Sequence, residues 1–457
     1  MLRADTLAGL LGGRLEAAPD ARLEIADLAS DSRLVVPGGG FVALPGEEMD
    51  GHAFVADAAH RGAALAVVGE GYAAGPEDPP LLIRVADTAA ALRAACSRRL
   101  AELGATVVGV TGSVGKTTAK EMCALALAGR PTARTPGNLN TWTQIPLSVL
   151  KLEPPVECLV VEMGMTARGE IADLAAFTHP RVGVVLNVGQ AHIGRLGSEE
   201  AIADAKAELL DALPADGAAV LNADDPRVIQ LEPRSPAPVR WFGEASPAAT
   251  WRVEDVEPDG VLGIRATLVG PDGRAPLWLR TPGRHLLLDA AAAAAVASAL
   301  GVGIAEAAAR LGEFAPAGHR GQILPGRGGS TLIDDSYNSS PTSLAAALQV
   351  LRESGALERL AIIGDMLELG DRTLAAHRDA GRRAAEAATG LIAVGPHAAT
   401  VAGSAVAAGL PRAVVEEAED AEQAADLALA RLHPGTVVLV KASRGIGLDE
   451  VVERLRA

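Results

Sequence analysis

The chain has 457 residues, of which 41 are lysine or arginine and 57 are aspartate or glutamate, so its formal net charge is -16 at pH 7. This length is too great for one hydrophobic core and predicts two to four domains. The acidic balance would repel a polyanion, which excludes a broad nucleic-acid-binding face and leaves small anionic ligands at local basic sites.

Cysteine usage and hydropathy indicate a protein of the reducing cytoplasm. Cys96, Cys123 and Cys158 are far apart in the sequence, which argues against a zinc site or a disulfide framework. The first residues are typical of a short amphipathic helix after Asp5 rather than of a secretory signal. The uncharged run over residues 290–305 is mostly alanine and shorter than the roughly 20 apolar residues of a membrane span, so we expect a buried helix there.

Residues 1–103 carry short strands and turns and predict a small α/β domain. Ser32, Arg33 and His52 lie in turns where they could contact a phosphorylated ligand. From the residues alone, a solvated turn is the commoner explanation. A helix over residues 88–103 is predicted to lead into the next domain.

The second block begins with an apolar run over residues 105–110, followed by a glycine-rich segment and a helical pattern. This order of strand, loop and helix is typical of a phosphate loop, in which backbone N–H groups and the helix N-terminus bind phosphate oxygens. Lys116 would reach the β- and γ-phosphates, and the Thr117 hydroxyl would hold Mg²⁺. Val110 stands where the full motif has its first glycine, and a plain glycine-rich turn is the alternative. The predicted nucleotide contacts are Gly112, Ser113, Val114, Gly115, Lys116, Thr117 and Thr118.

Further apolar strands over residues 156–161, 181–188 and 218–221 predict a parallel sheet, whose functional residues gather at the carboxyl ends of the strands. The polar residues at these ends include Glu162, Asn187, His192 and Asn222. Each could be a turn or cap residue by itself. Because all of them would share one rim with the phosphate loop, we interpret them as part of a site, in which Glu162 can hold Mg²⁺.

Two later features of this block carry weaker signals. Lys206 lies in a helical segment among acidic residues, where an ordinary surface ion pair is the default interpretation. Between residues 226 and 276, short strands punctuated by proline and glycine predict an antiparallel insert.

The third block starts near residue 318, and its strands over 330–333, 359–363, 391–394 and 436–440 alternate with helices. This alternation predicts a Rossmann-like domain, although no G-x-G-x-x-G follows its first strand. The strand-to-helix turn instead contains Asp334-Asp335-Ser336-Tyr337-Asn338, which exceeds what a helix cap requires. We interpret Asp334, Asp335, Tyr337 and Asn338 as ligand contacts.

Together these motifs resemble the Mur ligases, the ATP-dependent amide-forming enzymes of peptidoglycan precursor synthesis, over essentially the whole chain. The shared motifs are Thr111-Gly112-x-x-Gly115-Lys116-Thr117, Thr135-x-Gly137-Asn138-x-Asn140, Glu162, Asn187-x-Gly189-x-Ala191-His192, Lys206 and Asn222-x-Asp224-Asp225. Segments 334–341 and 364–370 look most like the members that add D-alanyl-D-alanine to UDP-N-acetylmuramoyl-tripeptide. Members that add the third residue share the first-domain signals at residues 31–33 and 50–52, but their DNPR-type motif has no counterpart here.

The resemblance implies an α/β protein of three domains. Residues 1–103 would bind the UDP-substrate, residues 104–317 would form the central ATP-binding sheet domain, and residues 318–457 would form a Rossmann-like domain that closes over the nucleotide. Its implied cofactors are ATP and Mg²⁺. The implied metal ligands are Thr117, Glu162, His192 and a carbamylated Lys206. The implied catalytic residues are Lys116, His192, Lys206 and Arg320. Further nucleotide contacts would come from Asn222, His285, Arg320, Asp335, Tyr337 and Asn338, and substrate contacts from Ser32, Arg33, Asp50, His52, Asn138 and Asn140.

The chain departs from the family pattern at residues 141–144, which stand where the family usually has Asn-x-Ile-Gly. Leu286 follows His285 where an asparagine is usual, and Asp289 takes a nearby position where an asparagine is expected. A smaller departure is Ala442 in place of a glycine.

Two other functions remain open from the sequence. One is another amide ligase of the superfamily, such as the third-residue-adding enzyme or a folylpolyglutamate synthase. The other is a P-loop ATPase without ligase activity, against which Glu162, His192 and Lys206 argue together. We expect a cytoplasmic monomer with no nucleic-acid partner and no integral membrane segment.

Overall fold

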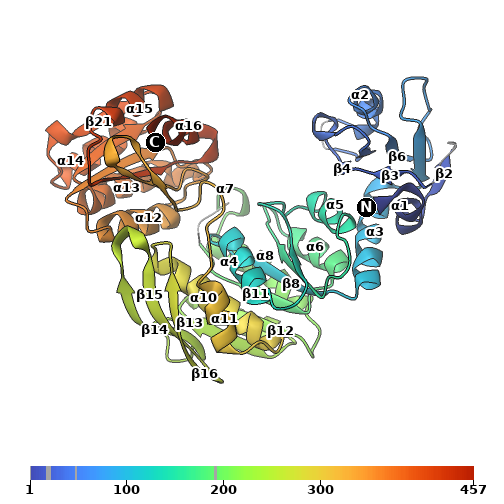
Figure 1. The fold of residues 1–457 in the computed structure, drawn as a ribbon, viewed down its shortest axis with the longest axis horizontal. Helices are drawn as coiled ribbons and strands as arrows, with labels where there is room; N and C mark the ends of the chain where they lie inside the picture. The colour runs from blue at the N-terminus through green and yellow to red at the C-terminus, as the bar shows by residue number, and fades with distance from the viewer. Residues whose placement is uncertain (1, 17–21, 47–48, 190–192) are drawn as a thin grey trace.

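The computed structural model describes residues 2–16, 22–46, 49–189 and 193–457. Its described residues form three main sheets, which follow one another along the chain and along the long axis of the molecule (Figure 1). Within the same residues, no helix is long and apolar enough to cross a membrane.

The first sheet has the strand order β2-β7-β6-β5-β4, and β4 to β7 are parallel to one another. Its long helix α3 begins after Asp87, whose side chain accepts the Ala90 N–H, and ends at Gly104 in the left-handed conformation, φ 63°. These ends match the helix predicted for residues 88–103. The elements are β1 (Leu2–Arg3), α1 (Ala4–Leu11), β2 (Arg14–Glu16), β3 (Glu24–Ile25), β4 (Leu28–Ala29), η1 (Ser32–Leu34), β5 (Gly40–Val42), η2 (Gly51–Phe54), α2 (Val55–His60), β6 (Leu65–Gly69), β7 (Leu81–Val85) and α3 (Thr88–Leu103).

The central sheet has the order β16-β15-β14-β13-β12-β11-β8-β10-β9. Strand β8 pairs in parallel with β10 on one side and β11 on the other, so the segments after all three strands leave at the same edge. The predicted insert is present as the antiparallel strands β14 to β16. The strands are β8 (Thr106–Thr111), β9 (Thr132–Arg134), β10 (Cys158–Glu162), β11 (Val182–Val185), β12 (Ala218–Asn222), β13 (Val239–Gly243), β14 (Trp251–Pro258), β15 (Ile264–Gly270) and β16 (Gly273–Leu279).

Helices cover both faces of the central sheet. The predicted alanine helix is α10, and residues 290–297 are all buried in one core with α4 and α11. Small side chains let α10 pack closely against α4. Helices α3, α6 and α8 share a second core on the other face. The helices are α4 (Lys116–Ala126), α5 (Gln144–Leu150), α6 (Glu170–Thr178), α7 (Ile193–Leu196), α8 (Glu199–Asp211), α9 (Pro226–Ile229), η3 (Glu232–Arg234), η4 (Gly260–Leu262), α10 (Arg284–Ala299) and α11 (Ile304–Leu311).

The third sheet has the order β17-β18-β22-β19-β20-β21, parallel except for the edge strand β17. Helices α12 to α14 line one core, and α15 and α16 line the other. The elements are β17 (Gln322–Pro325), η5 (Arg327–Gly329), β18 (Thr331–Asp334), α12 (Pro341–Glu353), β19 (Glu358–Gly364), η6 (Gly370–Arg372), α13 (Thr373–Ala387), β20 (Gly390–Val394), α14 (Ala398–Ala407), η7 (Arg412–Val414), β21 (Val415–Ala418), α15 (Ala421–Leu429), β22 (Thr436–Lys441), η8 (Arg444–Ile446) and α16 (Asp449–Leu455).

The segment after β19 contacts the central part of the chain. Its η6 turn packs against α7, and the Arg372 guanidinium lies 3.7 Å from the Glu199 carboxylate at the start of α8. Glu199 also forms an ion pair with Arg227. The third sheet is therefore in contact with the helix that carries Lys206.

Candidate active site

The phosphate-loop segment lies between β8 and α4, at the edge where β8, β10 and β11 end. Helix α4 begins at Lys116, and Gly115 precedes it with φ 85°. Glycine adopts this conformation without the steric cost of a β-carbon. The Lys116 Nζ donates a hydrogen bond to the Gly112 carbonyl at 2.9 Å, which holds the ammonium across the loop.

Asn187 stabilises the loop from the end of β11. Its Oδ1 accepts hydrogen bonds from the Ser113 and Val114 N–H groups, both at 3.0 Å, and its Nδ2 donates to the Val114 carbonyl at 3.1 Å. The Ser113 hydroxyl accepts the Gly189 N–H at 2.8 Å. Asn187 therefore positions the loop backbone, a role that its place at a strand end did not specify.

Thr117 and Glu162 meet at the floor of the loop. The Thr117 hydroxyl donates to Glu162 Oε2 at 2.7 Å, and the Asn140 amide donates to Glu162 Oε1 at 2.8 Å. Thr117 and Glu162 are buried. A hydroxyl and a carboxylate are oxygen ligands of the kind that Mg²⁺ prefers, so these two side chains fit the predicted ion.

Lys206 is buried on α8, with 2% of its surface exposed. It is therefore not a surface lysine paired with its acidic neighbours, as the sequence pattern suggested. Those neighbours have other partners: Asp204 pairs with Arg168, and Glu208 accepts the Gly169 and Ala172 N–H groups. Burial holds the pKa of Lys206 well below its usual value, and the nearby Lys116 ammonium lowers it further. A lowered pKa favours the neutral amine, which is the nucleophilic form.

Lys120 is a residue that sequence reasoning missed. It lies one turn after Lys116 on α4 and is fully buried, and its Nζ donates to the Thr135 carbonyl at 2.6 Å and also to the Gly137 carbonyl. The ammonium thus anchors the segment that leads to Asn140. Its spacing of four residues from Lys116 was the available signal, because this spacing places both side chains on one helix face.

The third sheet contributes a second group of predicted residues after β18. The buried Lys441 ammonium lies 2.6 Å from Asp335 Oδ2 and donates to the Asn338 carbonyl at 2.8 Å. Two guanidinium groups lie near the Tyr337 ring, with Arg320 3.8 Å and Arg444 5.2 Å from its centroid. The Arg444 guanidinium also donates to the Tyr337 hydroxyl at 3.1 Å.

Two residues of the central part of the chain lie within electrostatic range of this group. Burial lowers the pKa of the Lys116 ammonium, the Glu162 carboxylate opposes this shift, and the Arg320 guanidinium adds to it. The imidazole of His285, at the start of α10, lies within electrostatic range of Asp335 and Lys441. The structure therefore brings Arg320 towards the phosphate loop and Asp335 towards His285.

Other predicted residues lie differently. The Asn222 amide is engaged by the backbone, because it donates to the Leu186 carbonyl at 2.8 Å and accepts the Asp224 N–H at 2.8 Å. Asn138 is exposed, and Thr118 lies on the first turn of α4. His192 is outside the described residues, so its predicted role stays a prediction.

The predicted substrate residues of the first block gather at one edge of its sheet. Ser32 and Arg33 form η1 after β4, and Asp50 and His52 lie at η2 after β5, while α2 packs against both turns. Asp50 Oδ1 lies 2.7 Å from His52 Nδ1, and His52 Nε2 accepts the Gly69 N–H at 2.8 Å. The Arg33 guanidinium pairs with Asp31 and is exposed to solvent.

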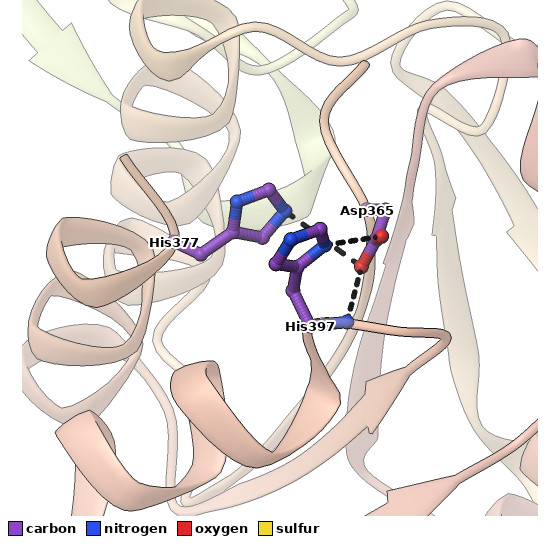
Figure 2. A group of neighbouring side chains, drawn as sticks. All are labelled: Asp365, His377 and His397. Carbon is purple, nitrogen blue, oxygen red and sulfur yellow. Dashed lines mark hydrogen bonds and ion pairs between the residues drawn. The ribbon is translucent and has the colours of Figure 1, made fainter. Parts of the chain in front are cut away.

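Asp365, His377 and His397 form a separate titratable cluster (Figure 2). His397 Nδ1 lies 2.6 Å from Asp365 Oδ2, and the two imidazole rings stack with centroids 4.4 Å apart. His377 Nε2 accepts the Met366 N–H at 3.1 Å, and its Nδ1 donates to the Thr373 carbonyl at 2.7 Å. Both nitrogens of His377 are thus used within the protein, and the cluster fixes the turn after β19.

Two family models match the chain, the Mur ligase middle domain over residues 110–297 and the Mur ligase glutamate ligase domain over residues 319–444. The match to the middle domain contains the phosphate loop, Glu162 and Lys206. The match to the glutamate ligase domain contains Asp335, Tyr337 and Lys441. The chain belongs to the Mur ligase family.

The similar proteins point to one branch of this family. UDP-N-acetylmuramoyl-tripeptide--D-alanyl-D-alanine ligase of Mycobacterium tuberculosis (strain ATCC 25618 / H37Rv) is 36% identical over 93% of this chain and 91% of its own. A crystal structure of MurF from Acinetobacter baumannii aligns with a TM-score of 0.87 at 28% identity, over 99% of this chain and 98% of that one. MurF of Thermotoga maritima in complex with ADP aligns with a TM-score of 0.79 at 28% identity, over 94% and 96%.

Proposed function

We propose that this protein is the ATP-dependent ligase that joins D-alanyl-D-alanine to UDP-N-acetylmuramoyl-tripeptide in the cytoplasm. The observation that carries the proposal is the juxtaposition of the Lys116 loop, the Thr117–Glu162 pair and the buried Lys206. The similarity to D-alanyl-D-alanine ligases over 93% of the chain supports the choice of substrates.

An amide does not form from a carboxylate and an amine in water unless the carboxylate is activated. We propose that the tripeptide carboxylate attacks the γ-phosphate of ATP and gives an acyl phosphate, from which the incoming amine displaces phosphate. Both steps concentrate negative charge, so fixed cations stabilise them. Lys116 would hold the β- and γ-phosphates, and Arg320 would add a second cation from the other side of the site.

Thr117 and Glu162 would hold Mg²⁺, which supplies charge neutralisation at the phosphates when bound. His192 and Lys206 are the proposed ligands of a second ion. An unmodified amine at Lys206 is no match for Mg²⁺, whereas its carbamate offers carboxylate-like oxygens. The low pKa of Lys206 favours this modification, because only the neutral amine adds to CO₂.

We further propose that the chain divides into functional domains at residues 1–103, 104–317 and 318–457. The first would bind the UDP moiety near Ser32, Arg33, Asp50 and His52, the second would bind ATP, and the third would close over the nucleotide. Each range contains one of the main sheets. Asn138 and Asn140 would line the path of the substrate between the first two.

The test is ADP formation by the purified protein with UDP-N-acetylmuramoyl-tripeptides that end in lysine or in diaminopimelate, each with and without D-alanyl-D-alanine. We expect ADP and a pentapeptide product only when both substrates are present. Acceptance of a free third amino acid or of glutamate on a folate would support the alternative ligases. ADP release without any acceptor would support an ATPase without ligase activity.

A further inference from the structure

Lys120 is a fully buried cation on α4, one turn beyond the phosphate loop. Its Nζ donates to the Thr135 carbonyl at 2.6 Å and to the Gly137 carbonyl, and both carbonyls lie in the loop between β9 and α5. It also forms an ion pair with Glu121 at 3.1 Å. Because a buried ammonium is costly without such partners, these contacts hold the lysine and the loop together.

The segment that Lys120 holds, residues 135–140, contacts Glu162 at two points. The Thr135 hydroxyl accepts the Glu162 N–H at 3.2 Å, and the Asn140 amide donates to Glu162 Oε1 at 2.8 Å. The segment thus fixes the main chain of Glu162 and one of its two carboxylate oxygens. Any movement of the segment would therefore change the direction in which this carboxylate points.

Gln144 holds the far end of the same segment from the first turn of α5. Its Oε1 accepts the Asn140 N–H at 3.2 Å. Gln144 belongs to residues 141–144, where this chain departs from the pattern usual in the family and has glutamine in place of glycine. A glycine has no side chain that could accept this N–H, so the contact depends on the departure.

The charge of Lys120 and its contacts with the segment would have opposite effects on a metal ion. Burial lowers the pKa of Lys120, and the Glu121 and Glu162 carboxylates oppose this shift, so the ammonium lies within electrostatic range of Glu162. A fixed positive charge there repels a divalent cation, and its removal by itself would strengthen metal binding. Loss of the carbonyl contacts would instead release Asn140 and weaken metal binding at Glu162. The direction of the change therefore separates the two effects.

We propose that Lys120 and Gln144 are positioning residues for the Glu162 carboxylate. They hold the 135–140 segment at its two ends, and Asn140 transmits their effect to Glu162. This proposal rests on the proposed ATP-dependent function, in which Glu162 is a ligand of Mg²⁺. Neither positioning residue contacts the nucleotide or the ion, so both act through the segment.

The first measurement is hydrogen exchange of the full chain without nucleotide or metal, for wild type, Lys120→Met and Gln144→Ala. Amides within residues 132–142 should exchange about tenfold faster in Lys120→Met and about threefold faster in Gln144→Ala, because each variant loses contacts that hold the segment. The control is Lys151→Met, which removes an exposed lysine that pairs with Asp27 and should leave this exchange unchanged.

The second measurement is Mn²⁺ binding in the presence of ADP, followed by electron paramagnetic resonance. We expect binding about tenfold weaker in Lys120→Met and about threefold weaker in Gln144→Ala, as for other residues that orient a metal ligand. Asn140→Ala should weaken binding by a factor similar to that of Lys120→Met. The double variant of Lys120 and Asn140 should bind little more weakly than either single variant, because both residues act along one path.

Tighter Mn²⁺ binding by Lys120→Met would show that charge outweighs positioning and would overturn the proposal, as would additive effects in the double variant. Exchange at the wild-type rate over residues 132–142 would also overturn it. If Lys120→Met does not fold, Gln144→Ala decides: faster exchange with weaker Mn²⁺ binding supports the proposal, and faster exchange with wild-type Mn²⁺ binding counts against it. A wild-type protein that binds neither ADP nor Mn²⁺ would instead refute the proposed function itself.

Discussion

The Lys116 and Lys206 side chains, one on the phosphate loop and one on α8, lie close enough for the first ammonium to lower the pKa of the second amine. Two cations this close in a buried place repel each other, and the neutral form of Lys206 relieves the repulsion. The same arrangement favours the neutral amine at Lys206, the form that can be modified, and leaves the Lys116 side chain to face an anionic ligand.

Replacement of Lys206 by alanine should abolish most ligase activity, and short-chain carboxylates should restore part of it. The reason is that the amine nitrogen bonds to the carbon of CO₂ and loses a proton, which gives a carbamate that an added carboxylate can imitate. The measurement is product formation with and without millimolar-range acetate or propionate. Normal turnover of Lys206→Ala, together with an unmodified lysine in a bicarbonate-supplied crystal, would rule the carbamate out.

Lys116→Ala should lower turnover by roughly 10² to 10³-fold, because its charge is required where the phosphates gather negative charge. The fold should survive, since Lys116 is the first residue of α4 and its ammonium donates to the loop carbonyl of Gly112 rather than to the core. Phosphate release measures the turnover, and circular dichroism measures whether the fold is retained. Lys151→Ala is the control, because this lysine pairs with Asp27 far from the loop, and it should retain wild-type turnover.

Glu162→Gln should reduce turnover by about 100-fold or more and shift the Mg²⁺ dependence to higher concentration, because a neutral amide is a weaker ligand than a carboxylate. Glutamine keeps an oxygen that can accept from Thr117, whereas its NH₂ group cannot accept from the Asn140 amide, so the hydrogen bond between the floor of the loop and this side chain is retained. The measurement is phosphate release over a range of Mg²⁺ concentrations. An unchanged Mg²⁺ dependence in this variant would contradict the assignment of Glu162 as a ligand.

Arg320→Ala should lower kcat far more than it weakens ATP binding, because Arg320 acts from the third sheet on the site at Lys116. If Arg320 made only a surface ion pair, its removal would cost about 0 to 1 kcal/mol and leave turnover almost unchanged. Small-angle scattering with a non-hydrolysable ATP analogue and UDP-tripeptide should show compaction of the wild type. Absence of compaction together with normal turnover of Arg320→Ala would refute closure, and the exposed Arg352→Ala on α12 is the control.

The difference in folding stability between wild type and the His377→Gln variant should become smaller as the pH falls. Burial lowers the pKa of His377, so the unfolded chain takes up a proton at a higher pH than the folded chain does. The wild type therefore loses stability below about pH 6.5, where an ordinary histidine titrates, whereas the glutamine variant has no such loss. Melting temperatures at pH 7.5 and pH 5.5 measure this, with the exposed His433→Gln as control, and an equal difference at both pH values would contradict it.

The sequence predicted the buried strands of the central and third sheets because continuous apolar runs form such strands, as in β8, β10 and β22. It missed β9, β17 and β21, which are short edge strands with partly exposed residues and no hydrophobic pattern. The prediction that α/β domains follow one another along the chain agrees with the sheet order.

The sequence predicted the roles of site residues less well where those roles depend on whether the side chain is buried. Nothing in the local pattern distinguishes the buried Lys206 from a surface lysine, because its acidic neighbours resemble ordinary helical ion pairs. Asn187 and Asn222 stand at strand ends as predicted, yet both amides bond to backbone groups. Only the fold reveals which side chain points to a ligand and which one supports the loop.

The Glu199 carboxylate forms an ion pair with Arg227, which belongs to the same central part of the chain. It also forms an ion pair with Arg372, which follows β19 in the third part. This contact lies at the start of α8, away from the phosphate loop, and on the same helix as Lys206. One carboxylate therefore ties the third part of the chain to the helix that carries the proposed metal ligand Lys206, through side chains that take no part in the proposed phosphate binding.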